Sequence, residues 1–435
     1  MNSMKPFTSV IIPTHNRVAA LKRSLDALKA QSYPLQQIEV IVVADGCTDG
    51  TVEMLRSYEA PFALQIVEQS GQGAATARNQ GAAHAKGTLL LFLDDDIEPT
   101  PYLVEAHASA HQNQLSHVVI GYLPPVLQNQ TGFFRAKLRG WWEAMFCPMR
   151  QYGHRFSYRN LLSGNFSLQA ELFNQVGGFD ASFKCHEDYE LGVRLIQAGA
   201  NFTFDENALG YHHEITDLDR SLQRKYQEGK ASVQLGRKYP ELISTFPVLY
   251  LFKSRSPLFQ SILLILIFQF PIVSDWIVTS FRGWLNVLEY MRMHGSWHRL
   301  LDQLLGYWFM RGVADVLNTQ VALAQFLELE PIAATQEEPE IEVDLKEGLV
   351  AAEQVLDTYR PTSIRIFYGH QPVGHVPLAP GRERLRGEHL RPFLATTLAS
   401  SLLSAIALEK ATDALGLKDF SAKPVTFSQE TVYVN

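Results

Sequence analysis

Cysteine and positive charge are both scarce in this sequence, and each scarcity narrows what the protein can be. The three cysteines, Cys47, Cys147 and Cys185, have spacings that fit neither a disulfide framework nor a set of metal ligands. We therefore expect a reducing, cytoplasmic environment. The formal net charge is -7, and no basic stripe could follow a phosphate backbone, so we expect no nucleic-acid partner.

Long apolar runs are also rare. The first residues, MNSMKPFTSVIIPTHNR, contain only a three-residue apolar run before Pro13, which is too short for the core of a signal peptide. The stretch from Ser256 to Ser274 is the exception, because it carries no charge and has the length of a membrane-spanning candidate. Two prolines near its ends and two glutamines inside it argue against a span. A helix on the cytoplasmic face of a membrane and a helix buried against the protein both stay open.

Short β-branched runs alternate with helical stretches over the first hundred residues. Strands are predicted at 9–12, 39–43, 64–67 and 89–93, and helices at 18–31, 50–58 and 74–85. This alternation predicts an α/β fold with a mostly parallel sheet flanked by helices. In such sheets ligands bind beyond the carboxyl ends of the strands. The loops PTHNR, ADGCTDG and DDDIEP therefore become candidate parts of a site.

The rest of the chain divides by composition. We predict a catalytic domain over residues 1–217, an apolar helical region over 218–330, an acidic linker at 331–345 and a small α+β module over 346–435. The stretch SIRIFYGHQPVGHVPL predicts two strands joined by a turn, and a long helix is predicted from Glu388 to Leu415. No pattern indicates what this last module does.

Acidic residues follow two of the predicted strands. The triplet Asp94–Asp96 comes directly after the apolar run LLLFL, although adjacent carboxylates resist burial. Asp45 ends another strand, and an acidic pair at 187 and 188 begins a helix. Mn²⁺ and Mg²⁺ prefer oxygen ligands and often share them with substrate phosphates. An Asp-x-Asp pair therefore predicts a divalent-cation site for a reaction with a diphosphate leaving group.

Five motifs together resemble a known family. They are TSVIIPTHNR, VIVVADGCTDGT, GAATARNQGAAHAKGTLLLFLDDDIEP, SGNFSLQAELFNQVGGFD and HEDYELGVRLIQAGA. In order and spacing they resemble the family 2 glycosyltransferases with the GT-A fold, over roughly residues 7–215. The resemblance implies a mixed, mostly parallel sheet and inverting transfer of a sugar, from a UDP-sugar before other donors, to an acceptor hydroxyl. Polysaccharide, glycolipid and glycoprotein synthesis are the implied settings, with a carbohydrate, lipid or protein acceptor.

The resemblance also implies roles for individual residues. Asp188 would be the catalytic base, and Asp96 would bind Mn²⁺ or Mg²⁺ together with Asp94. His212 would be a further metal ligand, although a histidine at a strand end is often structural, and His213 is the alternative. The implied nucleotide-sugar contacts are Pro13, Thr14, His15, Asn16, Arg17, Asp45, Arg78, Asp94 and Asp95. The implied acceptor contacts or supporting residues are Glu187, Gly164 and Asn165.

Departures from the family pattern leave other functions open. Ala44 and Cys47 stand where the family usually has an acid and a serine, which weakens the nucleotide assignment. No Arg-Trp pair of the processive enzymes occurs, so we expect one transfer per encounter. A nucleotidyltransferase would need a glycine-rich phosphate loop after the first strand, which PTHNR is not. The remaining alternative is a catalytically impaired sugar-nucleotide binding or scaffold protein.

An aromatic and basic stretch, GFFRAKLRGWW, has two interpretations. Trp141 and Trp142, with the cations that precede them, suit an acceptor sugar or anionic lipid headgroups. A packed aromatic cluster with a solvated basic edge fits the same residues.

Overall fold

The protein is described by a computed structural model that covers residues 5–112, 117–126, 132–247, 257–329 and 340–415. The chain forms two compact units. The first contains the described residues of Met1–Gln151, Phe156–Ala334 and Pro380–Glu383. The second contains those of Tyr152–Arg155, Thr335–Ala379 and Arg384–Asn435. The segments predicted at 1–217 and 218–330 thus belong to one unit.

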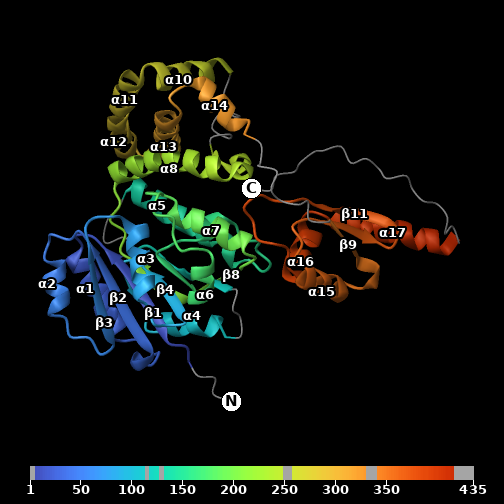
Figure 1. Cartoon of the computed structure of the whole chain (residues 1–435). Coiled ribbons are helices and arrows are strands. Elements are labelled where there is room, and N and C mark those ends of the chain that lie inside the picture. Colours follow the sequence, from blue (N-terminus) through green and yellow to red (C-terminus); the bar gives the residue numbers. More distant parts are fainter. Residues whose placement is uncertain (1–4, 113–116, 127–131, 248–256, 330–339, 416–435) are drawn as a thin grey trace. The chain divides into compact units, whose positions relative to one another are not determined.

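An eight-stranded sheet forms the centre of the first unit, in the order β3-β2-β1-β4-β7-β6-β8-β5 (Figure 1). Strands β3, β2, β1 and β4 run parallel, and so do β6 and β8, whereas β4–β7, β6–β7 and β5–β8 are antiparallel. The predicted fold class, a mixed and mostly parallel sheet flanked by helices, is confirmed. The strands are β1 (Thr8–Thr14), β2 (Ile38–Asp45), β3 (Ala63–Gln69), β4 (Leu89–Leu93), β5 (Ile97–Pro99), β6 (His117–Tyr122), β7 (Asn165–Gln169) and β8 (Asn201–His212).

Helices connect and cover these strands. Those of the sheet domain are α1 (Val18–Leu28), α2 (Thr51–Arg56), α3 (Ala74–His84), α4 (Leu103–Ala110), α5 (Phe133–Phe146), α6 (Ala170–Gln175) and α7 (Glu187–Gln197). Those of the helical region are α8 (Leu218–Lys238), α10 (Pro257–Gln269), α11 (Pro271–Ser280), α12 (Arg282–Tyr290), α13 (His294–Leu317) and α14 (Gln320–Leu327).

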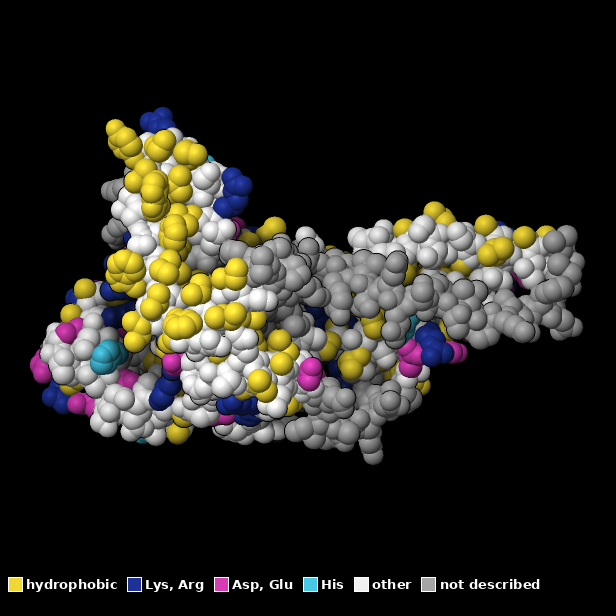
Figure 2. Space-filling model, turned by 90° about the horizontal axis from the view of Figure 1, so that it is seen from above, with side chains coloured by type: hydrophobic (Ala, Val, Ile, Leu, Met, Phe, Trp, Pro, Cys, Tyr) yellow, Lys and Arg dark blue, Asp and Glu magenta, His cyan; other side chains and the backbone are white. Residues whose placement is uncertain are grey.

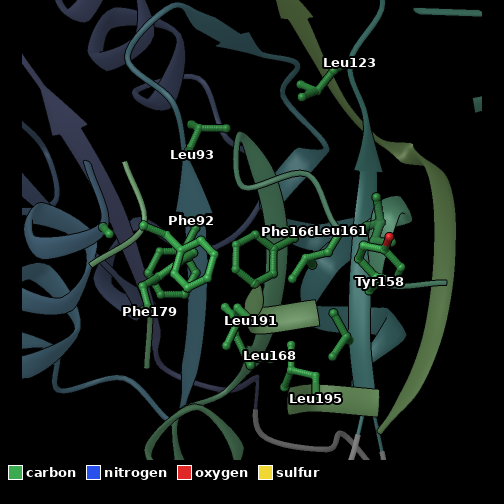
Figure 3. Packing of buried hydrophobic residues seen from close by; sticks show 14 of the residues in the cluster. Phe92, Leu93, Leu123, Tyr158, Leu161, Phe166, Leu168, Phe179, Leu191 and Leu195 are labelled. Carbon is green, nitrogen blue, oxygen red and sulfur yellow. The ribbon is translucent and has the colours of Figure 1, made fainter. Parts of the chain in front are cut away.

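The apolar run Leu89–Leu93 forms strand β4, which lies inside the sheet between β1 and β7. All five residues are buried, as expected for a central strand with helices on each face. Phe92 stacks on Phe166 of β7 with 4.9 Å between ring centroids, and Phe179 meets it edge-on at 5.4 Å (Figure 3). Each such aromatic pair is worth about 0.5–1.5 kcal/mol beyond its buried area. This packing anchors the strand from which the acidic triplet projects.

The helical region shares a hydrophobic core with the sheet domain. Helices α8 and α13 approach each other closely at two glycines. A Cβ on Gly229 would lie 2.0 Å from the backbone oxygen of Phe309, and one on Gly312 would lie 2.0 Å from that of Tyr226. Only glycine permits this separation, so the two helices pack backbone to backbone.

No single helix within the described ranges is long and apolar enough to cross a bilayer. Two bent pairs reach the required length and composition only when their members are combined. One joins Ser261–Gln269 to Pro271–Tyr290 at 113°, and the other joins Gly387–Thr396 to Ala399–Ala414 at 88°. Length and composition alone do not separate such pairs from core helices.

The second unit contains a three-stranded sheet in the order β11-β10-β9. The two strands predicted from SIRIFYGHQPVGHVPL are present as β10 (Ile364–Tyr368) and β11 (Gln371–Val376), antiparallel to each other. Strand β9 (Ile341–Asp344) pairs in parallel with β10, although it lies within the range predicted as a linker. Helix α15 (Leu349–Tyr359) connects β9 to β10.

The single helix predicted from Glu388 to Leu415 is wrong. The chain forms α16 (Gly387–Thr396) and α17 (Ala399–Leu415), bent by 88°. A straight helix of that length would measure about 42 Å, whereas a five-residue strand such as β10 spans about 17 Å. Only the bend lets Leu394 of α16 and Ala405 of α17 enter one small core.

The two units are interleaved along the chain. Residues Pro380–Glu383 belong to the first unit, although the residues on both sides belong to the second. Glu383 is fully buried, and its carboxylate accepts a hydrogen bond from the backbone N–H of Phe156 at 3.0 Å. The backbone N–H of Glu383 donates in turn to the Phe156 carbonyl at 2.9 Å.

Candidate active site

Three neighbouring parallel strands, β1, β2 and β4, end at one edge of the sheet and bring the predicted loops together. Pro13 and Thr14 are the last residues of β1, and Asp45 is the last of β2. Asn16 adopts a left-handed conformation (φ 52°), and its side-chain oxygen accepts a hydrogen bond from the backbone N–H of Thr48 at 2.7 Å. His15 Nδ1 lies 2.5 Å from the backbone oxygen of Asp45. PTHNR and ADGCTDG thus form one connected surface.

Asp45 holds the loop that precedes helix α3. Its carboxylate accepts hydrogen bonds from the Gln69 side chain at 2.8 Å and from the backbone N–H groups of Gln72 and Gly73 at 2.7 Å each. Burial opposes ionisation of Asp45, but these hydrogen bonds outweigh it and hold its pKa below the usual range. The carboxylate therefore stays charged while it shapes the predicted nucleoside pocket.

The acidic triplet is divided by its surroundings. Asp95 is buried and accepts hydrogen bonds from Thr14 Oγ1 at 2.7 Å and from Arg17 at 3.1 Å. Burial raises the pKa of Asp95 to about 6. Burial also opposes ionisation of Asp96, but His212 and Arg17, the latter 2.6 Å away, outweigh it and lower the pKa of Asp96. The surroundings of Asp96 thus favour its ionised form.

Arg78 connects the triplet to the helix that carries the predicted base. Its guanidinium, almost fully buried on α3, donates to Asp94 at 2.7 Å and to Glu187 at 3.0 Å. It also lies over the Phe179 ring, 5.4 Å from the centroid. Arg78 therefore fixes the distance between the β4 loop and the start of α7.

Asp188 lies in the first turn of α7. The preceding residue, His186, has a left-handed backbone (φ 63°), which is uncommon for a residue other than glycine and turns the chain sharply into the helix. Asp188 accepts a hydrogen bond from the backbone N–H of Tyr189 at 2.8 Å. Burial raises the pKa of Asp188 to about 7, and the neighbouring charge of Glu187 adds to the rise. Glu187 is paired with Arg78, whereas the raised pKa of Asp188 suits it to take up a proton near neutral pH.

His212, the last residue of β8, faces the acidic triplet. Its Nε2 lies 3.6 Å from Asp96, and its ring meets Trp142 of α5 edge-on at 5.0 Å. Its Nδ1 is buried and has no hydrogen-bond partner among the described residues. His213 instead lies 2.6 Å from Glu98, in a pair that ties β8 to β5. Of the two histidines, His212 is therefore the one placed beside the predicted metal ligand.

Gly164 and Asn165 have different surroundings despite being neighbours. A Cβ on Gly164 would lie 2.9 Å from Asp94 Oδ2, so this position needs glycine to leave room for the carboxylate. The side chain of Asn165 is fully buried between β6, β7 and β8, where it donates to Ala208 O and accepts from His107 Nε2. Because Asn165 has no exposed surface, its position favours the supporting role over an acceptor contact, the two alternatives left open by the sequence.

Two supporting contacts had no signal in the sequence pattern. Ser24 of α1 donates to the backbone oxygen of Asp95 at 2.9 Å and so holds the triplet against the first helix. Trp142, which the sequence left between acceptor contact and packing, is buried against His212 and Phe146. Trp141 beside it is partly exposed. A periodicity argument assigns both Ser24 and Trp142 to helix faces but not to this site.

The charges of the site do not balance. Three cationic groups, Arg17, Arg78 and His212, whose pKa Asp96 raises against the effect of burial, face six carboxylates, of which those of Asp95 and Asp188 have raised pKa values. The carboxylates are Asp45, Asp94, Asp95, Asp96, Glu187 and Asp188. Even with two of them protonated, an anionic diphosphate would meet net repulsion unless a further cation accompanied it.

Comparison with known proteins shows which proteins this chain resembles. Residues 9–177 match the model of glycosyl transferase family 2, and residues 143–217 match that of the N-terminal domain of galactosyltransferase. Validoxylamine A glucosyltransferase from Streptomyces hygroscopicus subsp. jinggangensis is 32% identical over 272 residues, which cover 55% of this chain and 62% of that protein. Glycosyltransferase AglE from Haloferax volcanii is 29% identical over 238 residues, covering 54% and 76%.

Among solved structures, the mannosyltransferase PcManGT from Pyrobaculum calidifontis in complex with GDP-Man and Mn²⁺ aligns with a TM-score of 0.48 at 17% identity, covering 73% of this chain and 89% of that one. The chain spans less than two thirds of the length of the validoxylamine A glucosyltransferase. The match to glycosyl transferase family 2, over residues 9–177, lies within the first unit apart from Tyr152–Arg155, and it agrees with the resemblance that the five motifs predicted.

Proposed function

We propose that the protein transfers a sugar from a nucleotide-sugar donor to an acceptor hydroxyl, with inversion at the anomeric carbon and with the help of a divalent cation. The observation that carries this proposal is the pairing of a carboxylate-rich strand edge with a separate carboxylate, Asp188, whose pKa is raised to about 7. A UDP-sugar is the proposed donor. Synthesis of a polysaccharide, glycolipid or glycoprotein at the cytoplasmic face of a membrane is the proposed setting.

The donor set fits Mn²⁺ or Mg²⁺. Asp96 stays ionised and lies 3.6 Å from His212, whose buried Nδ1 makes no hydrogen bond to the described residues and lies 3.9 Å from Glu214 Oε2. No group of three or more His, Cys, Asp or Glu side chains in the described part of the chain is arranged to hold a metal ion by itself. Such cations commonly take only one or two protein ligands and complete their shell with phosphate oxygens and water. Asp96 and His212, with Asp94 nearby, would hold the ion, which would neutralise charge on the leaving diphosphate.

The protein's own groups account for the rest of the reaction. Arg17 and Arg78 lie among the acids, and their role in this proposal is to bind the negatively charged diphosphate. Asp188 takes the proton of the acceptor hydroxyl as its oxygen attacks the anomeric carbon, on the face opposite the leaving group. Glu187 is instead engaged by Arg78, whose guanidinium lies 3.0 Å from its carboxylate. One displacement with one base gives inversion.

A donor screen tests the proposal directly. The purified full chain is incubated with UDP-, GDP- and dTDP-sugars and Mn²⁺, and released nucleotide is measured with and without a mixture of oligosaccharide and lipid acceptors. We expect release from one nucleotide class and its loss in the Asp188→Asn variant. Binding of a donor without any release, in the parent chain, would instead establish the impaired binding or scaffold function.

A further inference from the structure

Helix α11 buries polar side chains and exposes apolar ones, which is the reverse of the usual arrangement of a helix in water. Its two polar residues that are not exposed, Ser274 and Asp275, point toward α13, where both lie within hydrogen-bond distance of the Tyr307 hydroxyl, at 2.7 and 2.6 Å. Asp275 also receives Arg311 at 3.3 Å. Most outward positions of the same helix are apolar, with Ile272 82% and Trp276 75% exposed, and the exposed polar residues, Thr279 and Ser280, lie at its end. Water would favour the opposite arrangement.

The apolar surface continues over the neighbouring helices. On α12, Leu285 is buried, whereas Trp284 is 57% and Tyr290 is 90% exposed. Hydrophobic side chains form a long band on the face of the first unit seen from above (Figure 2). The exposed apolar side chains of α10–α12 and the residue that follows, which we call the apolar face, are Ile262, Ile265, Phe270, Ile272, Val273, Trp276, Ile277, Phe281, Trp284, Val287, Tyr290 and Met291. A patch of this kind marks an interaction surface.

The charged residues of this segment are also divided by position, with the acids bound inside the unit and most of the arginines exposed. Residues 257–299 contain only two acids, Asp275 and Glu289. Both are used inside the unit, because Glu289 accepts a hydrogen bond from the backbone N–H of Phe133 at 2.8 Å. Two of the three arginines, Arg292 and Arg299, are exposed at the end of α12 and in the second turn of α13. The apolar face therefore has a cationic border and no outward carboxylate among its described residues.

We propose that the apolar face docks the first unit on an anionic phospholipid bilayer, lying in the interface without spanning it. Exposed tryptophan and tyrosine side chains suit the boundary between headgroups and acyl chains, and arginines beside them suit phosphate headgroups. A second copy of the chain would offer the same cationic border rather than an anionic one. The 113° bend between the two halves of the segment keeps them from forming one straight span.

The assignment extends the open sequence interpretation of residues 256–274 to a defined face made by three helices. It rests on side-chain direction and charge, and it does not depend on the proposed sugar transfer, since no residue of the candidate active site belongs to the apolar face. The two can therefore fail separately.

Vesicle flotation tests the docking. The full chain is mixed with vesicles of equal parts phosphatidylglycerol and phosphatidylethanolamine, or of phosphatidylcholine alone, and centrifuged through a density gradient. We expect the parent to float with the anionic vesicles, less with the neutral ones, and less again in high salt. The double variant Trp276→Glu, Trp284→Glu should lower the vesicle-bound to free ratio at least about tenfold, because each change places a charge in the headgroup boundary.

Two controls separate docking from misfolding. Tyr102→Glu changes an aromatic side chain of similar exposure (65%) at the start of α4, and it should float like the parent. Trp276→Phe retains an apolar aromatic group and should also float. The proposal is overturned if the parent stays with the free protein in both gradients, if it binds both vesicle types equally, or if the double variant floats normally. Sedimentation showing a dimer that the double variant dissociates, without vesicle binding, would assign the face to a second copy instead.

Discussion

Replacing Asp188 with asparagine tests the chemistry of the site most sharply. The substitution keeps the size of the side chain. It also keeps an oxygen that can accept the hydrogen bond from the backbone N–H of Tyr189, which lies 2.8 Å from Asp188 Oδ1 in the parent. It removes only the ability to take up a proton. Because that proton moves only as the acceptor hydroxyl attacks, the variant loses an interaction made in the transition state and not in the donor complex.

The expected magnitude follows from the role and the pKa. General-base assistance is typically worth about 10²–10⁴ in rate, so Asp188→Asn should lower kcat at least about a hundredfold while the donor Kd stays near that of the parent. A base with a pKa raised to about 7 is protonated below that pH and active above it. In the parent, kcat/KM should therefore fall about tenfold per pH unit below 7 and level off above 7. The Asp188→Asn variant should not show this fall of kcat/KM at low pH.

Two measurements decide the outcome. Nucleotide release under saturating acceptor gives kcat across pH 5.5–9, a range chosen to span the pKa of about 7 by roughly two units on either side, and donor titration followed by calorimetry gives Kd. The matched control is Glu187→Gln, which removes one partner of Arg78 (3.0 Å) and should raise the donor KM more than it lowers kcat. The reasoning fails if Asp188→Asn turns over like the parent, or if it loses donor affinity with kcat intact.

Three further predictions follow from other parts of the first unit. Asp96→Asn should lower kcat/KM at least about a hundredfold, and excess EDTA should stop the parent; full turnover in EDTA would refute the metal assignment. His107, fully buried, has its pKa lowered to about 4 by burial, so the unfolded state binds the extra proton first. Stability should be complete above pH 6.5 and fall by about 3 kcal/mol as the pH drops to about 4, and His107→Gln should flatten this slope in urea unfolding. Phe92→Ala should cost about 3–5 kcal/mol in the same assay, and a loss below 1 kcal/mol would contradict the packing described for β4.

The parts of the site that follow strands could be predicted from sequence. Asp45, Asp94 and His212 each stand at or just after the end of a strand, and the regular geometry of a sheet converts that position into a shared edge. Arg78 and Asp188 came only from the family motifs, since a helix period cannot tell which neighbouring element a side chain will meet. The ion pairs of Arg78 with Asp94 and Glu187 confirm that the two motifs converge.

What depends on packing between distant segments could not be predicted. Asn165 stands next to Gly164, yet its side chain turns into the sheet because Gly121 leaves room for it, since a Cβ on Gly121 would lie 2.1 Å from Asn165 Nδ2. The break between α16 and α17 falls at Thr397 and Leu398, with no proline or glycine at the junction to signal it. Its cause is the short span of the sheet it covers. Such outcomes depend on the shape of a neighbour that is remote in sequence.

The return of Pro380–Glu383 to the first unit has a consequence for modularity. A domain joined to another by a single crossing can be cut away, exchanged or acquired whole, whereas here the chain enters the second unit three times, at Tyr152–Arg155, Thr335–Ala379 and Arg384–Asn435. A chain truncated near residue 334 would lack Glu383, so the buried N–H of Phe156 would lose its carboxylate acceptor. The C-terminal module is thus not an appendage that can be trimmed from an independent catalytic domain. Limited proteolysis between the units should weaken the core that holds Phe156, rather than release two intact halves.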